Sequence, residues 1–167
     1  MNTPIPALLQ RLGIEQLNPM QEKVLETAKT NDQLVVLAPT GSGKTIGFLL
    51  PLLQHLEADV AGVQALVITP TRELALQIEQ VFRVMGTEFK VNTTYGGHSM
   101  KIEKNNFSEP PALLIGTPGR IVDHLNRGNL DLSGVRTLVL DEFDKSLEMG
   151  FQEDMTIILK QLKRVRK

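Results

Sequence analysis

The chain has 167 residues, of which 41% are hydrophobic, and this size suits one domain with its own core. Its formal net charge is −1, so any contact with nucleic acid must come from locally placed arginines, lysines and backbone N–H groups. Cysteine is absent, which excludes disulfides, thiolate metal sites and a cysteine nucleophile. No signal peptide or membrane-spanning apolar run occurs, so we expect a soluble, cytoplasmic protein without membrane contact.

The first predicted strand is the apolar run 34–38, which shows little polar alternation and is typical of a strand covered on both faces. It leads into a glycine-rich loop and a predicted helix. The loop consists of Ala38, Pro39, Thr40, Gly41, Ser42, Gly43, Lys44 and Thr45. Glycines let consecutive backbone N–H groups turn around an anion, and the helix start adds the positive end of its dipole. We therefore predict a nucleoside triphosphate site in which Lys44 reaches the β- and γ-phosphates and Thr45 ligates Mg²⁺.

Three further apolar runs are predicted to be strands of the same buried kind: 65–69, 112–116 and 137–140. Residues 91–95 alternate between apolar and polar and are typical of an edge strand. Helical periods follow Thr71 and Thr117, which are suitable N-cap residues. This alternation predicts an α/β fold with a parallel sheet and helices on both faces. Ligands of such sheets bind outside the carboxyl ends of the strands, where the glycine-rich loop lies.

A second cluster of chemical groups, Asp141 to Asp144, follows the predicted strand 137–140. We expect Asp141 at the carboxyl edge of the sheet beside Thr45, where it would hold the magnesium shell, and Glu142 as the group that orients or polarises the attacking water. Asp144 would pair with a basic or hydroxyl group, and the ring of Phe143 is expected to pack inward. Taken alone, the cluster could instead be an acidic first turn that stabilises the next helix.

Four motifs, in their order and spacing, resemble those of the first RecA-like domain of a DEAD-box RNA helicase, and the resemblance covers nearly the whole chain. The motifs are Pro70-Thr71-Arg72-Glu73-Leu74-Ala75, Gly96-Gly97, Thr117-Pro118-Gly119-Arg120 and Asp141 to Asp144. The resemblance implies a RecA-like P-loop NTPase domain that uses ATP and Mg²⁺ and holds RNA by its backbone, without sequence readout. It assigns RNA contacts to Pro70, Thr71, Arg72, Gly97, Thr117, Gly119 and Arg120. Read singly, these residues could instead be helix caps with solvated arginines.

The stretch 13–21 is similar to the family's adenine-reading Q motif, with Gln21 in the glutamine position. An amide can both donate to and accept from the adenine edge, so Gln21 predicts a preference for ATP over GTP. The match is incomplete, because Ile14, Leu17 and Asn18 stand where the family has an aromatic residue, a proline and a threonine.

The resemblance implies one domain over residues 1–167, with a Q-motif region at 1–30 and a core at 31–167. The sequence ends before a Ser-Ala-Thr motif and a second RecA-like domain, so we expect it to be the N-terminal part of a longer helicase, with Asp144 at the contact between domains. On its own, the chain is expected to be a monomer that binds nucleotide with little or no unwinding. Two other functions stay open: a non-catalytic, nucleotide-dependent RNA clamp or adaptor, and a DNA translocase.

Overall fold

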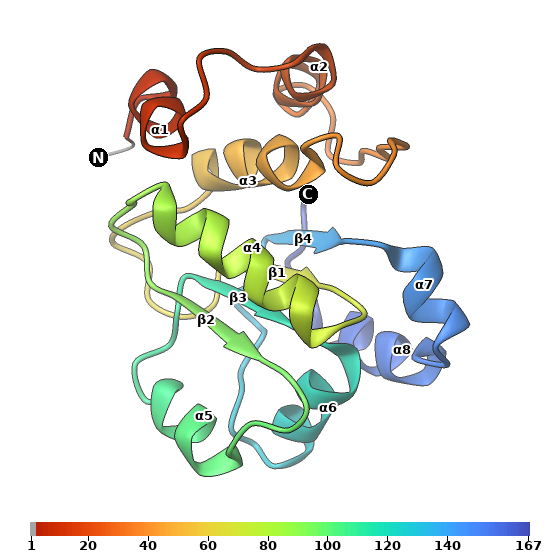
Figure 1. The fold of residues 1–167 in the computed structure, drawn as a ribbon. Helices are drawn as coiled ribbons and strands as arrows, with labels where there is room; N and C mark the ends of the chain where they lie inside the picture. The colour runs from red at the N-terminus through yellow and green to blue at the C-terminus, as the bar shows by residue number, and fades with distance from the viewer. Residues whose placement is uncertain (1–2) are drawn as a thin grey trace.

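The structure, a computed structural model, describes residues 3–167 and alternates helices and strands around one parallel sheet (Figure 1). The elements are α1 (Ile5–Leu12), α2 (Pro19–Thr27), α3 (Lys44–Gln54), β1 (Ala65–Ile68), α4 (Arg72–Val84), β2 (Val91–Thr94), α5 (Met100–Asn106), β3 (Leu113–Gly116), α6 (Pro118–Asn126), β4 (Thr137–Leu140), α7 (Phe143–Glu148) and α8 (Gln152–Gln161). The strand order is β2-β3-β1-β4, and every neighbouring pair is parallel. The predicted α/β architecture is therefore confirmed.

The core lies in two layers because successive side chains of a strand point to opposite faces. On one face, Ala65 and Val67 of β1 pack with apolar side chains of α1, α3 and α4. On the other face, Leu66 and Ile68 pack with those of α6 and α8. Both faces of the sheet are thus covered by helices, and functional groups can lie only at the ends of the strands. No helix within residues 3–167 combines the length and apolarity that a membrane crossing requires.

Most predicted elements form where the sequence pattern indicates. The strands β1, β3 and β4 lie within the three later apolar runs, and β2 is the edge strand that alternation predicted. Thr71 caps α4, because its side chain accepts a hydrogen bond of 3.3 Å from the N–H of Leu74. Thr117 is the N-cap residue of α6 and is followed by Pro118, although its side chain makes no capping bond.

The predicted strand 34–38 is wrong. The segment is not part of a strand, and Val35 and Leu37 are 90% and 92% exposed. A strand forms only beside a partner, and the outer edge of β4 is occupied by the last residues of the chain. The N–H of Leu138 donates to the carbonyl of Lys167 over 2.7 Å, and the N–H of Arg166 donates to the carbonyl of Arg136 over 2.9 Å. The run therefore has the composition of a strand but no neighbouring strand among the described residues.

Candidate functional site

The carboxyl ends of three strands meet at one edge of the sheet. Gly116 of β3 pairs in register with Ile68 of β1 and with Thr94 of β2. The ladder continues past the strands, since the N–H of Thr69 donates to the carbonyl of Gly116 over 3.0 Å and that of Thr117 donates to the carbonyl of Thr94 over 3.1 Å. The three motif segments that follow these strands therefore begin side by side.

The acidic cluster joins the same edge through β4. The N–H of Asp141 donates to the carbonyl of Ile68 over 2.9 Å, which places Asp141 directly beside the start of the segment that leads to α4. Burial of the Asp141 carboxyl raises its pKa above the usual range, and Glu142 adds to this rise, whereas the nearby Lys44 ammonium acts to lower it. The glycine-rich loop 38–45, named the phosphate loop below after its predicted ligand, and the acidic cluster thus lie within electrostatic reach of each other.

The phosphate loop has its donors in place. Gly41 and Gly43 have φ angles of 80° and 83°, a left-handed conformation that L side chains rarely adopt. Lys44 begins α3, where the first backbone N–H groups have no partner inside the helix. The hydroxyl of Ser42 is buried and has no hydrogen-bond partner. A loop with open N–H groups, an orphaned hydroxyl and a lysine fits an anion such as a phosphate group.

The Lys44 ammonium is folded back onto its own loop. Its Nζ donates to the carbonyls of Ala38 and Pro39, both over 2.8 Å. These carbonyls hold the side chain over the loop without a buried counter-ion, so a bound phosphate can take their place.

Gln21 lies against the phosphate loop as part of a capping box at the start of α2. Its Oε1 accepts from the N–H of Asn18 over 3.0 Å, and its Nε2 donates to the carbonyl of Gly43 over 3.1 Å. A Cβ on Gly43 would lie only 2.5 Å from that Nε2, so a larger residue here would displace the Gln21 amide as well as strain the φ angle. Both ends of the Gln21 amide are therefore engaged, Oε1 in the capping box of α2 and Nε2 on the loop, a role that the sequence did not predict.

Glu142 is the only non-glycine residue within 3–167 that has a positive φ, at 49°. Side chains occupy this region at a cost, and such residues concentrate at functional sites. Its carboxylate lies 2.9 Å from the Nζ of Lys145, and this hydrogen bond raises the pKa of Lys145. The inward packing predicted for Phe143 is wrong: its side chain is 40% exposed, because it begins α7 on a side that faces solvent. Asp144 is exposed next to it.

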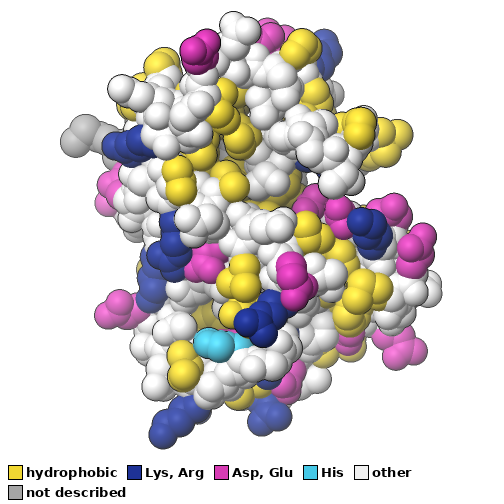
Figure 2. All heavy atoms as spheres, viewed as in Figure 1, with side chains coloured by type: hydrophobic (Ala, Val, Ile, Leu, Met, Phe, Trp, Pro, Cys, Tyr) yellow, Lys and Arg dark blue, Asp and Glu magenta, His cyan; other side chains and the backbone are white. Residues whose placement is uncertain are grey.

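The remaining motif residues surround the ends of β1, β2 and β3. The guanidinium of Arg72 stands 5.0 Å above the ring of Tyr95, which brings the start of α4 next to the glycine pair. Gly97 has a φ of 86°, so the pair forms a tight turn. Figure 2 shows basic, acidic and apolar side chains mixed over this face. Contact with nucleic acid would therefore depend on individual groups and not on one broad basic patch.

Comparison with known proteins gives the family. The family model described as DEAD/DEAH box helicase matches residues 18–167, which is most of the chain. The chain belongs to the DEAD/DEAH box helicase family. Its RecA-like fold is shared with solved structures of that family: the yeast DEAD-box splicing factor Prp28 superposes with a TM-score of 0.86 at 30% identity over 98% of this chain and 41% of that one. A hypothetical ATP-dependent RNA helicase from Sulfolobus tokodaii gives 0.85 at 32% identity, over 98% of this chain and 49% of that one.

The curated relatives of this DEAD/DEAH box chain are longer proteins. It is 40% identical over 153 residues to the DEAD-box ATP-dependent RNA helicase CshA of Geobacillus kaustophilus, which is 90% of this chain and 33% of that protein. It is 39% identical over 165 residues to the ATP-dependent RNA helicase DeaD of Escherichia coli K12, which is 97% of this chain and 26% of that protein. The chain therefore spans about a quarter to a third of these relatives.

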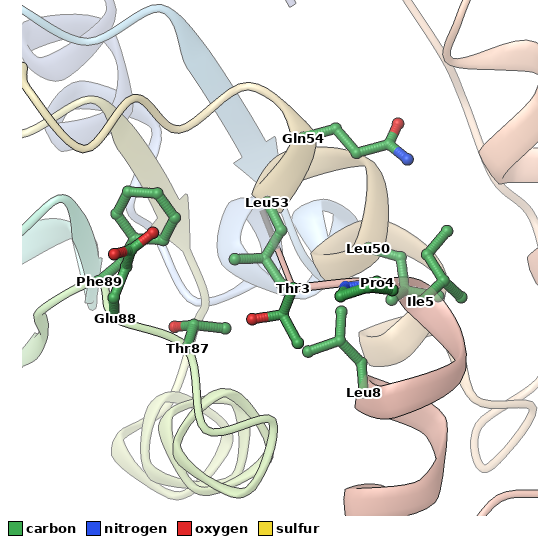
Figure 3. A pocket seen from close by; sticks show the side chains of 10 residues that line it. All are labelled: Thr3, Pro4, Ile5, Leu8, Leu50, Leu53, Gln54, Thr87, Glu88 and Phe89. Atoms are coloured by element: carbon green, nitrogen blue, oxygen red, sulfur yellow. The ribbon is translucent and has the colours of Figure 1, made fainter. Parts of the chain in front are cut away.

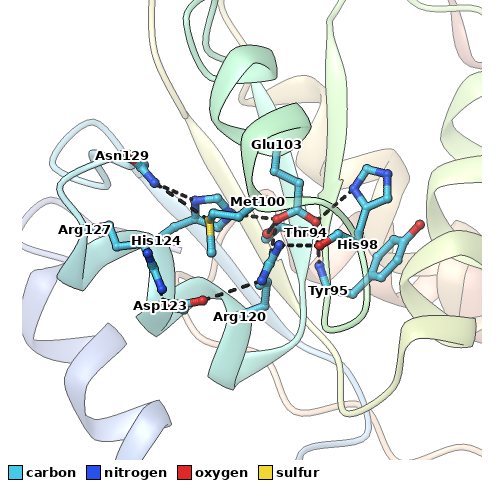
Figure 4. A network of polar contacts seen from close by, with 10 residues as sticks. All are labelled: Thr94, Tyr95, His98, Met100, Glu103, Arg120, Asp123, His124, Arg127 and Asn129. Carbon is cyan, nitrogen blue, oxygen red and sulfur yellow. Dashed lines mark hydrogen bonds and ion pairs between the residues drawn. The ribbon is translucent and has the colours of Figure 1, made fainter.

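A buried carboxylate that sequence reasoning missed lies beside Arg120 of this DEAD/DEAH box chain (Figure 4). Glu103 of α5 is 1% exposed, and its Oε2 accepts hydrogen bonds from Thr94 Oγ1 over 2.8 Å and from Arg120 Nε over 2.9 Å. The Nε2 of the fully buried His124 lies 2.6 Å from the same oxygen. Arg120 and His124 are four residues apart on one helix face, and this spacing could have indicated a shared acidic partner.

Glu103→Gln is expected to lower the free energy of unfolding by about 3 kcal/mol at pH 7, because it leaves Arg120 next to a neutral group in a buried cluster. Burial alone would raise the pKa of Glu103, but hydrogen bonds from His124, Arg120 and Thr94 outweigh it and hold the pKa below its usual range. A lowered folded-state pKa stabilises the protein above the unfolded-state value, and this contribution is lost as the pH falls through the folded-state value. The difference in unfolding free energy between the wild type and Glu103→Gln should therefore shrink below about pH 4.

Urea denaturation of both proteins over a pH series measures this difference. The exposed Glu153 of α8, changed to Gln, is the control and should give nearly wild-type stability at every pH. A wild-type advantage that stayed constant down to the most acid pH would contradict the assigned direction of the Glu103 pKa.

A cavity of about 220 Å³ lies away from all of these groups (Figure 3). It opens between α1, α3 and the 87–89 loop, and Leu8, Leu50, Leu53 and Phe89 supply much of its apolar lining. No predicted site residue lines it. The candidate site of this DEAD/DEAH box chain is therefore an open sheet edge and not this cavity.

Proposed function

We propose that this chain is the ATP-binding domain of an ATP-dependent RNA helicase, which couples ATP hydrolysis to the unwinding or remodelling of RNA. One observation carries the proposal: the N–H of Asp141 donates to the carbonyl of Ile68 at the sheet edge where the segments that lead to α4 and α6 also begin, and the Lys44 ammonium is near enough to act on the pKa of Asp141. The similarity to proteins named ATP-dependent RNA helicases supports it.

In this proposal, nucleotide binding draws the Lys44 ammonium from the Ala38 and Pro39 carbonyls to the β- and γ-phosphates. The backbone N–H groups at the start of α3 and the Ser42 hydroxyl complete the phosphate contacts; the whole nucleotide set is Gln21, Ala38, Pro39, Thr40, Gly41, Ser42, Gly43, Lys44 and Thr45. To hydrogen-bond with adenine, the Gln21 amide must either leave the carbonyl of Gly43 or donate to that carbonyl and to the base together.

Thr45 and Asp141 would hold Mg²⁺, partly through water. The ion, when bound, neutralises charge on the phosphates. Residues 3–167 contain no cluster of three or more acidic, histidine or cysteine side chains that could hold a metal, and Mg²⁺ commonly takes one or two carboxylates plus substrate phosphates. Burial and the neighbouring Glu142 raise the pKa of Asp141, and a bound cation would offset this rise because it favours the ionised carboxylate. Glu142 orients the attacking water.

The proposed RNA contacts come from the starts of α4 and α6 and from the glycine pair: Pro70, Thr71, Arg72, Gly97, Thr117 and Gly119. The resemblance also assigns Arg120 to RNA, but its guanidinium nitrogens are paired with Glu103, the His98 carbonyl and Asp123, so we propose that it supports these contacts and does not bind phosphate itself. Helix starts offer N–H groups to phosphate, and Arg72 adds charge. The chain has one tyrosine and no tryptophan, and that tyrosine, Tyr95, is covered by Arg72. Backbone binding without base stacking follows. A second RecA-like domain, met through Asp144, would complete the ATP site.

Turnover of ATP by the full-length protein, with and without single-stranded RNA, tests this function, together with calorimetric titration of Mg-ADP and Mg-GDP. We expect RNA to stimulate turnover and ADP to bind in preference to GDP. Binding of nucleotide and RNA without turnover would identify a clamp instead. Stronger stimulation by DNA of the same sequence would identify a DNA translocase.

A further inference from the structure

We propose that Glu103 is a positioning residue of the RNA groove, which fixes the glycine-pair loop against the start of α6 through Arg120. This inference rests on the proposed RNA-binding function. In Figure 4 the Glu103 carboxylate lies between the end of β2, the loop after it and α6. Its Oε1 accepts from the N–H of Tyr95 over 3.5 Å and lies 3.2 Å from His98 Nδ1, while its Oε2 faces Thr94, Arg120 and His124.

Arg120 transmits this contact to the loop itself. Its Nε donates to Glu103 over 2.9 Å, its Nη2 donates to the carbonyl of His98 over 2.7 Å, and its Nη1 lies 3.5 Å from Asp123. Each nitrogen of the guanidinium therefore has a protein partner, and the side chain is only 12% exposed. Arg72 is exposed by contrast. Arg120 thus holds the loop in shape, and Arg72 is the arginine free to meet phosphate.

The groove depends on this arrangement because its donors are backbone groups. Gly97 sits in a left-handed turn, and Thr117 begins a helix whose first N–H groups have no partner inside it. Backbone groups cannot change position as a long side chain can. The distance between the Gly97 turn and the start of α6 therefore decides whether one RNA backbone can contact both. Glu103 and Arg120 connect the two segments through hydrogen bonds made on the protein side of the proposed groove.

The first test measures the affinity of the full-length protein for a fluorescent single-stranded oligouridylate, with a non-hydrolysable ATP analogue present. Donor groups surround both carboxylate oxygens of Glu103, so the amide introduced by Glu103→Gln would point its NH₂ at donors in either orientation. Glu103→Gln should weaken RNA binding roughly tenfold while the affinity for Mg-ADP stays unchanged. Unchanged RNA affinity would overturn the proposal.

Gln64→Leu is the matched control for a general loss of stability. Gln64 is also buried, at 4% exposed, and its amide ties down the backbone of Glu57 and Val60 before β1, at the opposite end of the sheet. It should destabilise the fold but leave RNA affinity unchanged. Equal losses of RNA affinity in both variants would reduce Glu103 to an ordinary structural residue and overturn the proposal. Failure of the wild-type protein to bind RNA would instead contradict the proposed function.

The salt dependence of RNA binding gives a second readout, which also serves if Glu103→Gln does not fold. An arginine that contacts phosphate in single-stranded RNA contributes about 0.7 to the slope of log affinity against log salt concentration. Arg72→Gln should reduce the slope by about this amount. Arg120→Gln should weaken binding roughly tenfold and leave the slope unchanged. A slope reduced equally by both variants would show that Arg120 contacts phosphate and would overturn its positioning role.

Discussion

Lys44→Ala is expected to lower ATP turnover by the full-length protein by roughly 10²–10³-fold, because it removes a charge that stabilises the phosphates in the transition state. Mg-ADP should also bind at least about tenfold more weakly, as a charge-assisted hydrogen bond to the β-phosphate is lost. Steady-state phosphate release and calorimetric titration measure the two effects. The free protein loses two hydrogen bonds to loop carbonyls and the attraction between Lys44 and Asp141, so the melting temperature should fall only slightly.

Lys160→Ala is the control for loss of a positive charge, because Lys160 is exposed on α8, outside the proposed nucleotide site. The ATP turnover and the ADP affinity of Lys160→Ala should match those of the wild type. Wild-type turnover in Lys44→Ala would mean that the 38–45 loop does not hold the nucleotide phosphates, and the proposed ATP site would be wrong.

Glu142→Gln should reduce ATP turnover by roughly 10²–10⁴-fold while ATP still binds, because the amide fills the same space but cannot take up a proton from the water. Residue 142 keeps its left-handed backbone in the variant, and an amide oxygen can still accept from Lys145. Single-turnover hydrolysis and equilibrium binding of ATP separate the two steps.

Glu148→Gln, at the exposed end of the same helix, is the matched control and should hydrolyse ATP at the wild-type rate. Weakened ATP binding in Glu142→Gln, with turnover reduced only in proportion, would assign Glu142 to nucleotide binding and contradict its role with water.

The sequence predicted those parts of the fold that depend on local pattern. Continuous apolar runs marked β1, β3 and β4, alternation marked β2 as an edge, and Thr71 marked the start of α4. The glycine-rich loop and the acidic cluster could be singled out in the sequence because the chemistry proposed for them requires residue types in a fixed order.

The sequence failed where an outcome depends on neighbours that are distant along the chain. The run 34–38 has a strand composition, yet pairing depends on which segment occupies the edge of β4. Phe143 is apolar, but its exposure follows from the direction in which α7 leaves the sheet. Glu103 lies in a short polar helix with no apolar periodicity, so nothing local distinguishes its buried carboxylate from the exposed charges beside it.

We expect the exposed run 34–37 to affect how the chain behaves in concentrated solution. Its Val35 and Leu37 side chains are almost fully exposed and its backbone is not paired as a strand, so it offers a template on which a second molecule can add a strand. Crowding of molecules should therefore drive self-association through this run and, at high concentration, precipitation. The run leads directly into the phosphate loop, so association would also restrict the loop, and apparent nucleotide affinity would then depend on how concentrated the protein is.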